Sequence, residues 1–148
     1  MYNRILVAVD GSDTANLALN KAIKLAKDRH SALRLVHVVD LSSAYSDPAA
    51  PYVFEYQKAL EAAGQKVIAD SSALVRDAGI EFDTAAIVID VPGQHIYDAI
   101  EEEAKRWPAD LIVIGTHGRR GFRRLFLGSV AENVTRVSSK PVLLIRGA

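Results

Sequence analysis

The sequence predicts an α/β fold in which a five-stranded parallel sheet carries helices on both faces. Two observations favour this class. Five short apolar runs alternate with four segments that have helical spacing or helix-start signals, in the order β-α-β-α-β-α-β-α-β. The runs are also apolar at nearly every position, which is typical of parallel strands buried on both faces.

The first half of the chain predicts two strand–helix units. Residues 5–9 (Ile-Leu-Val-Ala-Val) form a β-rich run that ends in the turn signal Asp10-Gly11-Ser12. Residues 12–29 repeat alanine and leucine at helical spacing, and residues 33–39 form the second apolar strand. After a loop rich in proline and small residues, a long helix is expected from Val53 to about Ala78, with Gly79 as its stop.

The second half predicts three strands and two helices. A strand over 82–89 precedes the turn Asp90-Val-Pro-Gly93. A helix follows, marked by Ile96 and Ile100, and its run Glu101–Glu103 is expected to face solvent. The remaining elements are an apolar strand over 111–114, a helix after Gly128 and a last strand over 142–145.

Composition sets limits on function. The chain has 148 residues, 49% apolar and 24% charged, which fits one soluble domain spanning residues 1–148. Lys+Arg and Asp+Glu both number 18, so no overall field attracts nucleic acid or an anionic membrane, and neither is an expected partner. The absence of cysteine excludes disulfides and thiolate metal sites. Without a signal-peptide pattern or an apolar run of about 20 residues, we expect a cytoplasmic protein.

A glycine-containing segment carries the clearest functional signal. Gly115 and Gly118 follow the fourth strand, and Gly128-Ser129 begins the last helix. Glycine lets backbone N–H groups approach a ligand, and a helix N-terminus attracts anions, so the segment indicates a phosphate and hence a nucleotide. The chain has neither G-x-G-x-x-G after its first strand nor the G-x-x-x-x-G-K-[ST] of a P-loop. In open α/β sheets this segment would lie beside Asp10, across the switch in strand order.

The spacing Gly115-x2-Gly118-x9-Gly128-Ser129 matches G-x2-G-x9-G-[ST] at every fixed position. With it, the chain resembles the universal stress protein family in its nucleotide (ATP)-binding branch. The resemblance extends to the first strand with Asp10, to His37-Val-Val-Asp40 and to the closing run 140–145. It implies a single Rossmann-like domain of the adenine nucleotide alpha hydrolase-like type.

The resemblance also implies roles for individual residues. Asp10 would lie toward adenine and ribose, the Val38 backbone would meet the adenine edge, and the start of the last helix would hold the phosphates. ATP would bind with Mg²⁺ bridging its phosphate oxygens, so no metal site made of side chains and no catalytic residue is expected. The expected nucleotide contacts are Ala8, Asp10, Gly11, Val38, Ile114, Gly115, His117, Gly118, Arg119, Gly128, Ser129 and Val130.

Three features have a second interpretation. Ser129 and Glu132 form an S-x-x-E pattern that could serve only as a capping box. Asp10 could simply close the turn after the first strand. The arginine cluster between Arg119 and Arg124 could attract phosphate, contact a partner or be solvated. His37 has one interpretation, a strand side chain at or near the core.

The expected function is that of an ATP-binding regulator or switch in a stress response, with at most slow ATP hydrolysis. The chain has no P-loop lysine and no evident base for fast phosphoryl transfer. An adenylyl- or phosphotransferase and a nucleotide-free interaction module are the alternatives. The resemblance implies a homodimer through Val142 to Ile145, an apolar edge strand that needs covering. The sequence leaves open the stress, the protein partner and the choice between ATP, AMP and other adenine nucleotides.

Overall fold

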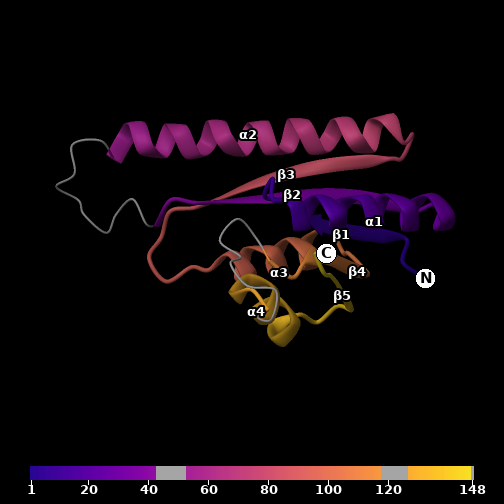
Figure 1. The fold of residues 1–148 in the computed structure, drawn as a ribbon. Coiled ribbons are helices and arrows are strands. Elements are labelled where there is room, and N and C mark those ends of the chain that lie inside the picture. The colour runs from indigo at the N-terminus through magenta and orange to yellow at the C-terminus, as the bar shows by residue number, and fades with distance from the viewer. Residues whose placement is uncertain (43–52, 118–126, 148) are drawn as a thin grey trace.

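The computed structural model describes residues 1–42, 53–117 and 127–147 (Figure 1). It confirms the predicted alternation of strands and helices, and the observed ends lie close to the expected ones. The elements are β1 (Arg4–Ala8), α1 (Asp13–Arg29), β2 (Ala32–Asp40), α2 (Val53–Asp77), β3 (Phe82–Ile89), α3 (Ile96–Arg106), β4 (Leu111–Gly115), α4 (Ser129–Val137) and β5 (Val142–Ile145).

The five strands form one parallel sheet in the order β3-β2-β1-β4-β5. The chain builds outward from β1 on one side through β2 and β3, then crosses to the other side for β4 and β5. The switch in strand order therefore lies between β1 and β4, as predicted, and both strands end at the same edge of the sheet. Within the described part of the chain, no helix is both long and apolar enough to cross a membrane.

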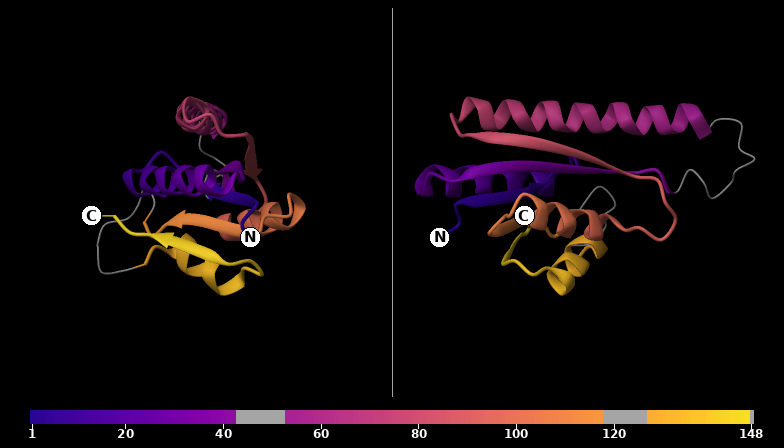
Figure 2. Two further views of the ribbon diagram at one scale, coloured as in Figure 1. Left: turned by 90° about the vertical axis from the view of Figure 1, so that its right-hand side faces the viewer. Right: turned by 180° about the vertical axis from the view of Figure 1, so that it is seen from behind.

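Helices cover both faces of the sheet because the strands are apolar on both sides. Side chains alternate along β1, so Ile5 and Val7 pack on one face while Leu6 packs on the other. The first face is covered by α1 and α2, and the second by α3 and α4. Both views of Figure 2 show α2 and α4 on opposite sides of the sheet.

Helix α2 packs closely on β2 because residue 64 is glycine. A Cβ at Gly64 would lie 3.0 Å from His37 Cδ2 and 3.0 Å from Val39 Cγ2. Both neighbours are side chains of β2, so a larger residue would require these side chains or the helix to shift. The glycine interrupts the helical pattern in sequence, but in the fold it lies buried at the contact between helix and sheet.

The expectation that Glu101–Glu103 faces solvent is wrong for two of its three residues. Only Glu102 is exposed. Glu103 is 2% exposed and pairs with Arg34 at 2.5 Å, and Arg34 in turn lies over the ring of Trp107. Arg106, three residues further along the helix, also pairs with Glu103. The sequence pattern missed the burial because the other cation, Arg34, comes from a strand far away in the chain.

Glu101 is also buried, and it joins α3 to the turn before β5. Its Oε1 accepts hydrogen bonds from the N–H and the hydroxyl of Ser139 at 3.0 and 2.9 Å. Burial raises the pKa of the Glu101 carboxyl, but the hydrogen bonds from Ser139 and Ser138 more than offset this, and the pKa lies below its usual value. The carboxylate therefore stays charged while holding the turn.

We expect Glu103→Gln to destabilise the protein more than Glu102→Gln does. The first change removes the charge that Arg34 faces in a buried site, at a cost of about 1–3 kcal/mol. The second removes an exposed charge on the same helix and should change stability by less than about 0.5 kcal/mol. Urea unfolding of both variants tests this, and equal losses would contradict the structural role assigned to Glu103.

Candidate functional site

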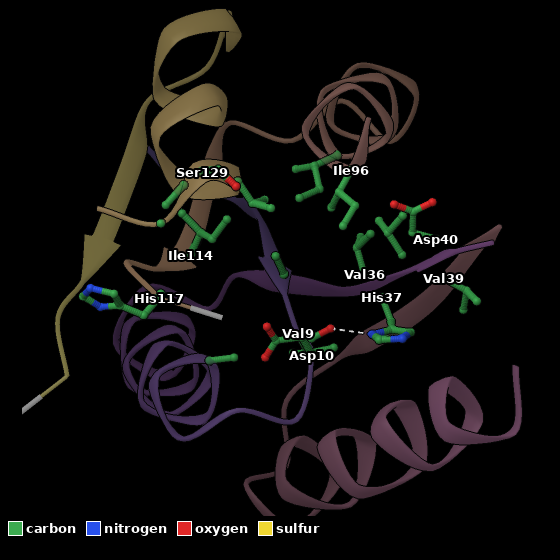
Figure 3. Close-up of a pocket in the computed structure, with 18 of the residues that line it drawn as sticks. Val9, Asp10, Val36, His37, Val39, Asp40, Ile96, Ile114, His117 and Ser129 are labelled. Carbon is green, nitrogen blue, oxygen red and sulfur yellow. Dashed lines mark hydrogen bonds between the residues drawn. The ribbon is translucent and has the colours of Figure 1, made fainter. Parts of the chain in front are cut away.

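A cavity of about 440 Å³ opens at the carboxyl end of the sheet, where strand order switches (Figure 3). Its size falls in the range that holds nucleotide-sized ligands. Residues from both faces of the sheet line the cavity, because it extends across the end of β1. Its walls come from the ends of β1, β2 and β4, from α2 and α3, and from the starts of α1 and α4.

Within the described residues, the last part of β2 offers this cavity a backbone edge that has no strand partner on the β1 side. The register pairs Ala8 of β1 with Val36, and the last ladder bond runs from the Val9 N–H to the Val36 carbonyl at 2.9 Å. Alternate residues of a strand point their backbone groups to the same side, so the N–H and C=O of Val38 also face the β1 side. Beyond Val9, no strand lies beside them in the described sheet. Val38 thus presents one donor and one acceptor at the cavity.

His37 fixes the end of this ladder. Its side chain is buried, and Nδ1 lies 2.8 Å from the carbonyl oxygen of Val9 (the dashed line in Figure 3). Because a carbonyl oxygen only accepts hydrogen bonds, Nδ1 carries the proton and donates it. The expectation that His37 lies at or near the core is confirmed, and the residue also lines the cavity.

Asp10 lies in the loop between β1 and α1 and lines the cavity. Its Oδ1 accepts a hydrogen bond from the Ser12 N–H at 2.9 Å, and the Ser12 hydroxyl accepts one from the Ala15 N–H at 3.2 Å. Ser12 is therefore the N-cap of α1. Gly11 between them has φ +82°, a conformation that favours glycine. Asp10 both closes the turn and lines the cavity, so its two interpretations are compatible.

The other end of the cavity is the N-terminus of α4. The N-cap is Gly128, which has no side chain that could form a capping hydrogen bond. The predicted capping box of Ser129 with Glu132 is therefore wrong. Ser129 is instead the first residue of the helix. The Gly128 N–H donates to the Thr116 carbonyl at 2.7 Å, whereas the helical pattern supplies no acceptor for the next N–H groups. These donors and the positive end of the helix dipole adjoin the cavity.

Two glycines allow this arrangement by close contact. A Cβ at Gly115 would lie 2.8 Å from Thr14 Cγ2 and 3.0 Å from the Thr14 carbonyl oxygen. A Cβ at Gly128 would lie 2.8 Å from the carbonyl oxygen of Thr116. Larger residues would therefore separate β4 from α1, or α4 from the end of β4.

The structure brings most of the expected contact residues to one cavity. Gly11 adjoins it without lining it, and Gly118, Arg119 and the rest of the cluster to Arg124 lie outside the described residues. The contact roles themselves stay predictions. The expected residues that line the cavity are Ala8, Asp10, Val38, Ile114, Gly115, His117, Gly128, Ser129 and Val130.

Sequence reasoning did not place several other lining residues at the site. Ile96 and Ile100 reach it from α3, and their i, i+4 spacing after a strand end was a usable signal. Tyr56 and Leu60 reach it from α2, which no local pattern indicated. Asp40 also lines the cavity, with Oδ1 accepting hydrogen bonds from the N–H and the hydroxyl of Ser42.

The carboxylates and imidazoles of the described chain do not form a metal site by themselves. No group of three or more histidine, aspartate or glutamate side chains within it could hold an ion.

A family model described as the Universal stress protein family matches residues 1–146. The chain belongs to the universal stress protein family. It is 31% identical over 153 residues to the universal stress protein YxiE of Bacillus subtilis, covering 99% of this chain and 100% of that relative. The resemblance to this family that the sequence indicated is therefore confirmed.

Solved structures of universal stress proteins share the fold. One from Burkholderia pseudomallei superposes with a TM-score of 0.81 at 32% identity, covering 99% of this chain and 97% of the other. A second, from Archaeoglobus fulgidus, is in complex with dAMP and superposes with a TM-score of 0.69 at 26% identity, covering 98% of each chain. At least one universal stress protein of this fold therefore binds an adenine nucleotide.

We expect Gly128→Ala to lower the stability of this universal stress protein by about 1–3 kcal/mol, because its Cβ would meet the Thr116 carbonyl. Ser129→Ala is the matched control. Residue 129 already carries a Cβ, so the change removes only a hydroxyl from the neighbouring position and should have little effect on folding. Urea unfolding of both variants measures the difference, and an equally stable Gly128→Ala would contradict the close contact.

Proposed function

We propose that the protein binds an adenine nucleotide, ATP with Mg²⁺, in the cavity at the switch point and acts as a nucleotide-dependent regulator of a stress response. One observation carries this proposal. The cavity joins a free strand edge at Val38, a carboxylate at Asp10 and the N-terminus of α4. These three features match, in order, the base, the sugar and the phosphates of a nucleotide.

The strand edge favours adenine among the bases. The Val38 N–H can donate to N1 of adenine, while its C=O accepts from the exocyclic amine. Guanine and hypoxanthine carry a proton on N1 and an oxygen at C6, so they would place donor against donor and acceptor against acceptor. Unpaired polar groups in a partly buried site are costly, so this backbone pair discriminates between the bases.

Asp10 and the end of β4 suit the ribose. A carboxylate accepts hydrogen bonds from sugar hydroxyls, and Asp10 lines the cavity just after the end of β1. Ile114 and Gly115 line the cavity from the neighbouring strand. The sugar would lie over the end of β1, with an apolar wall on one side.

The start of α4 suits the phosphates. Backbone N–H groups at Ser129 and Val130, the Ser129 hydroxyl and the helix dipole all favour negative charge. Mg²⁺, when bound through the phosphate oxygens, would neutralise part of their charge. Gly118 and Arg119 are proposed to add contacts from the segment before α4.

We propose a switch with at most slow hydrolysis, because the described cavity offers little for phosphoryl transfer. Asp10 and Asp40 are its only described carboxylates, and each accepts a hydrogen bond from its own loop. Binding without fast turnover keeps the nucleotide in place long enough to act as a signal. The protein is proposed to act in the cytoplasm, without nucleic acid or membrane as a partner.

The two alternatives make different demands on the site. A transferase of a related fold would use the loop after β1 for phosphate, but there the Ser12 hydroxyl caps α1. A nucleotide-free interaction module would have no need of a cavity that ends at a helix N-terminus. The nucleotide switch accounts for both features.

We expect isothermal titration to show ATP binding that Ser129→Glu weakens by about tenfold or more, a change of about 1.4 kcal/mol. A glutamate at the first helical position suits the helix dipole but repels phosphate, so binding should weaken while the fold survives. Ser129→Ala, which removes the hydroxyl without adding charge, should weaken binding less.

The same titration with ADP, AMP and cyclic AMP, each with and without Mg²⁺, identifies the preferred nucleotide. If folded wild-type protein binds none of the four, the nucleotide proposal is wrong and the interaction module becomes the leading alternative. Phosphate release at a rate comparable to dedicated kinases or ATPases would instead favour the transferase.

We also propose a homodimer through β5. This strand lies at the edge of the sheet, and its side chains from Val142 to Ile145 are only half-buried. The bonds from Ile112 N–H to Pro141 and from Thr116 N–H to Ile145 show that odd-numbered residues face β4. Val142 and Leu144 therefore turn their backbone groups outward, where a second copy can pair with them.

We expect Leu144→Pro to weaken this dimer and leave the subunit folded. Proline removes an N–H that points away from β4, so the internal ladder is untouched. Leu144→Ala trims the same side chain but keeps the N–H, and it should retain more of the dimer. Sedimentation velocity across a concentration series measures the association, and identical behaviour of the two variants would argue against pairing through the β5 backbone.

A further inference from the structure

The bond between His37 and Val9 lies where the parallel ladder should continue. After the Val9 N–H bonds to Val36, regular parallel pairing would next join the Val38 N–H to the Val9 carbonyl. That bond is not formed between these two described residues. The His37 imidazole occupies the same carbonyl instead, at 2.8 Å from Nδ1. A side chain thus donates to the acceptor that the next ladder bond would have used.

We propose that His37 is a positioning residue that keeps the Val38 N–H available for the nucleobase. The inference rests on the proposed function and adds a cause for the base selectivity of the site. By satisfying the Val9 carbonyl, the imidazole ends β1–β2 pairing one step early. The freed N–H of Val38, beside its C=O, then forms the donor–acceptor pair that matches adenine.

The surrounding structure holds the imidazole in this role. His37 is 8% exposed, so its ring has little freedom to turn away from Val9. The opposite edge of the ring faces α2, where a Cβ at Gly64 would lie 3.0 Å from Cδ2 and 3.2 Å from Nε2. The absent side chain at residue 64 leaves the room that the ring needs. Sheet and helix together fix the ring against the carbonyl.

Alternatives to this role predict different behaviour. If His37 only filled space, leucine would replace it without changing which base binds. If it only stabilised the fold, its loss would weaken the binding of every nucleotide equally. A positioning role instead changes the ratio of affinities for two nucleotides that differ at N1 and C6 of the base.

The test compares ATP with inosine triphosphate, which carries N1–H and a C6 oxygen, by isothermal titration. Wild-type protein should prefer ATP. His37→Leu should reduce the ATP-to-ITP affinity ratio by about tenfold, since the Val38 N–H would then pair with Val9. His37→Asn should restore most of the ratio, because its side-chain N–H lies near the position of Nδ1. Thermal unfolding confirms that each variant is folded.

Amide hydrogen exchange by NMR gives a second, independent measurement on the Val38 N–H. In nucleotide-free wild type, Val38 should exchange faster than Val36, and ATP should protect it. In His37→Leu without nucleotide, Val38 should already be protected. A Val38 amide that is protected in free wild-type protein would overturn the inference, whether or not the leucine variant folds.

The outcomes separate this inference from the proposed function. If wild-type protein binds no nucleotide, the proposed function fails and the base selectivity built on it fails too. If wild-type protein binds ATP and His37→Leu keeps the same ATP-to-ITP ratio, the nucleotide site stands and only the role of His37 is refuted. A reduced ratio that His37→Asn restores supports the positioning role.

Discussion

The cavity depends on one constraint, the mismatch in length between β1 and β2 at the carboxyl edge of the sheet. Strand β2 continues to Asp40, but its pairing with β1 ends at Val36. Backbone N–H and C=O groups that lose a strand partner need another one, from water, from a side chain or from a ligand. His37 satisfies the last β1 carbonyl, while Val38 is left facing the cavity. The ligand site begins where the sheet stops pairing.

Close backbone contacts hold the walls around that point. Gly64 lets α2 approach β2, Gly115 lets β4 approach α1, and Gly128 lets α4 begin directly beside Thr116. At Gly115 and Gly128 the contact would be too tight for a Cβ, and at Gly64 the facing side chains of β2 would have to shift, so the positions of three helices relative to the sheet depend on missing side chains. These close contacts also limit which substitutions can prevent ligand binding without disturbing the fold. A bulky residue at Gly128 would disturb the fold as well as the ligand, whereas a charge at Ser129 acts on the ligand alone.

The sequence predicted the fold well because strands buried on both faces leave a strong local pattern. The runs 82–89 and 142–145 match the observed strands to the residue. Glycine spacing and strand ends led sequence reasoning to Asp10 and Ser129, which both line the cavity, while their contacts with a nucleotide stay predictions. Prediction failed where the partner is distant in sequence. Buried Glu103 pairs with Arg34 of β2, and Leu60 lines the cavity because α2 packs on β2.

The capping pattern at Ser129 failed for a different reason. The serine and Glu132 have the right spacing, but the contact between the Gly128 N–H and the Thr116 carbonyl places the N-cap one residue earlier. Tertiary contact thus overrode a local signal and moved Ser129 into the first turn, where its hydroxyl adjoins the cavity.

A binding site built mainly from backbone groups depends little on the identity of the side chains at the contact positions. The proposed base contact is the N–H and C=O of Val38, and the proposed phosphate contacts are the first N–H groups of α4. Neither depends on the identity of the side chain, so relatives near 31% identity can differ widely and still present the same donors and acceptors. What must be kept is geometry, which means the glycines at close contacts and whatever ends the β1–β2 ladder. In this protein that second condition falls to a single side chain, His37, and base selectivity should therefore be more sensitive to residue 37 than to the residues that touch the base through their backbone.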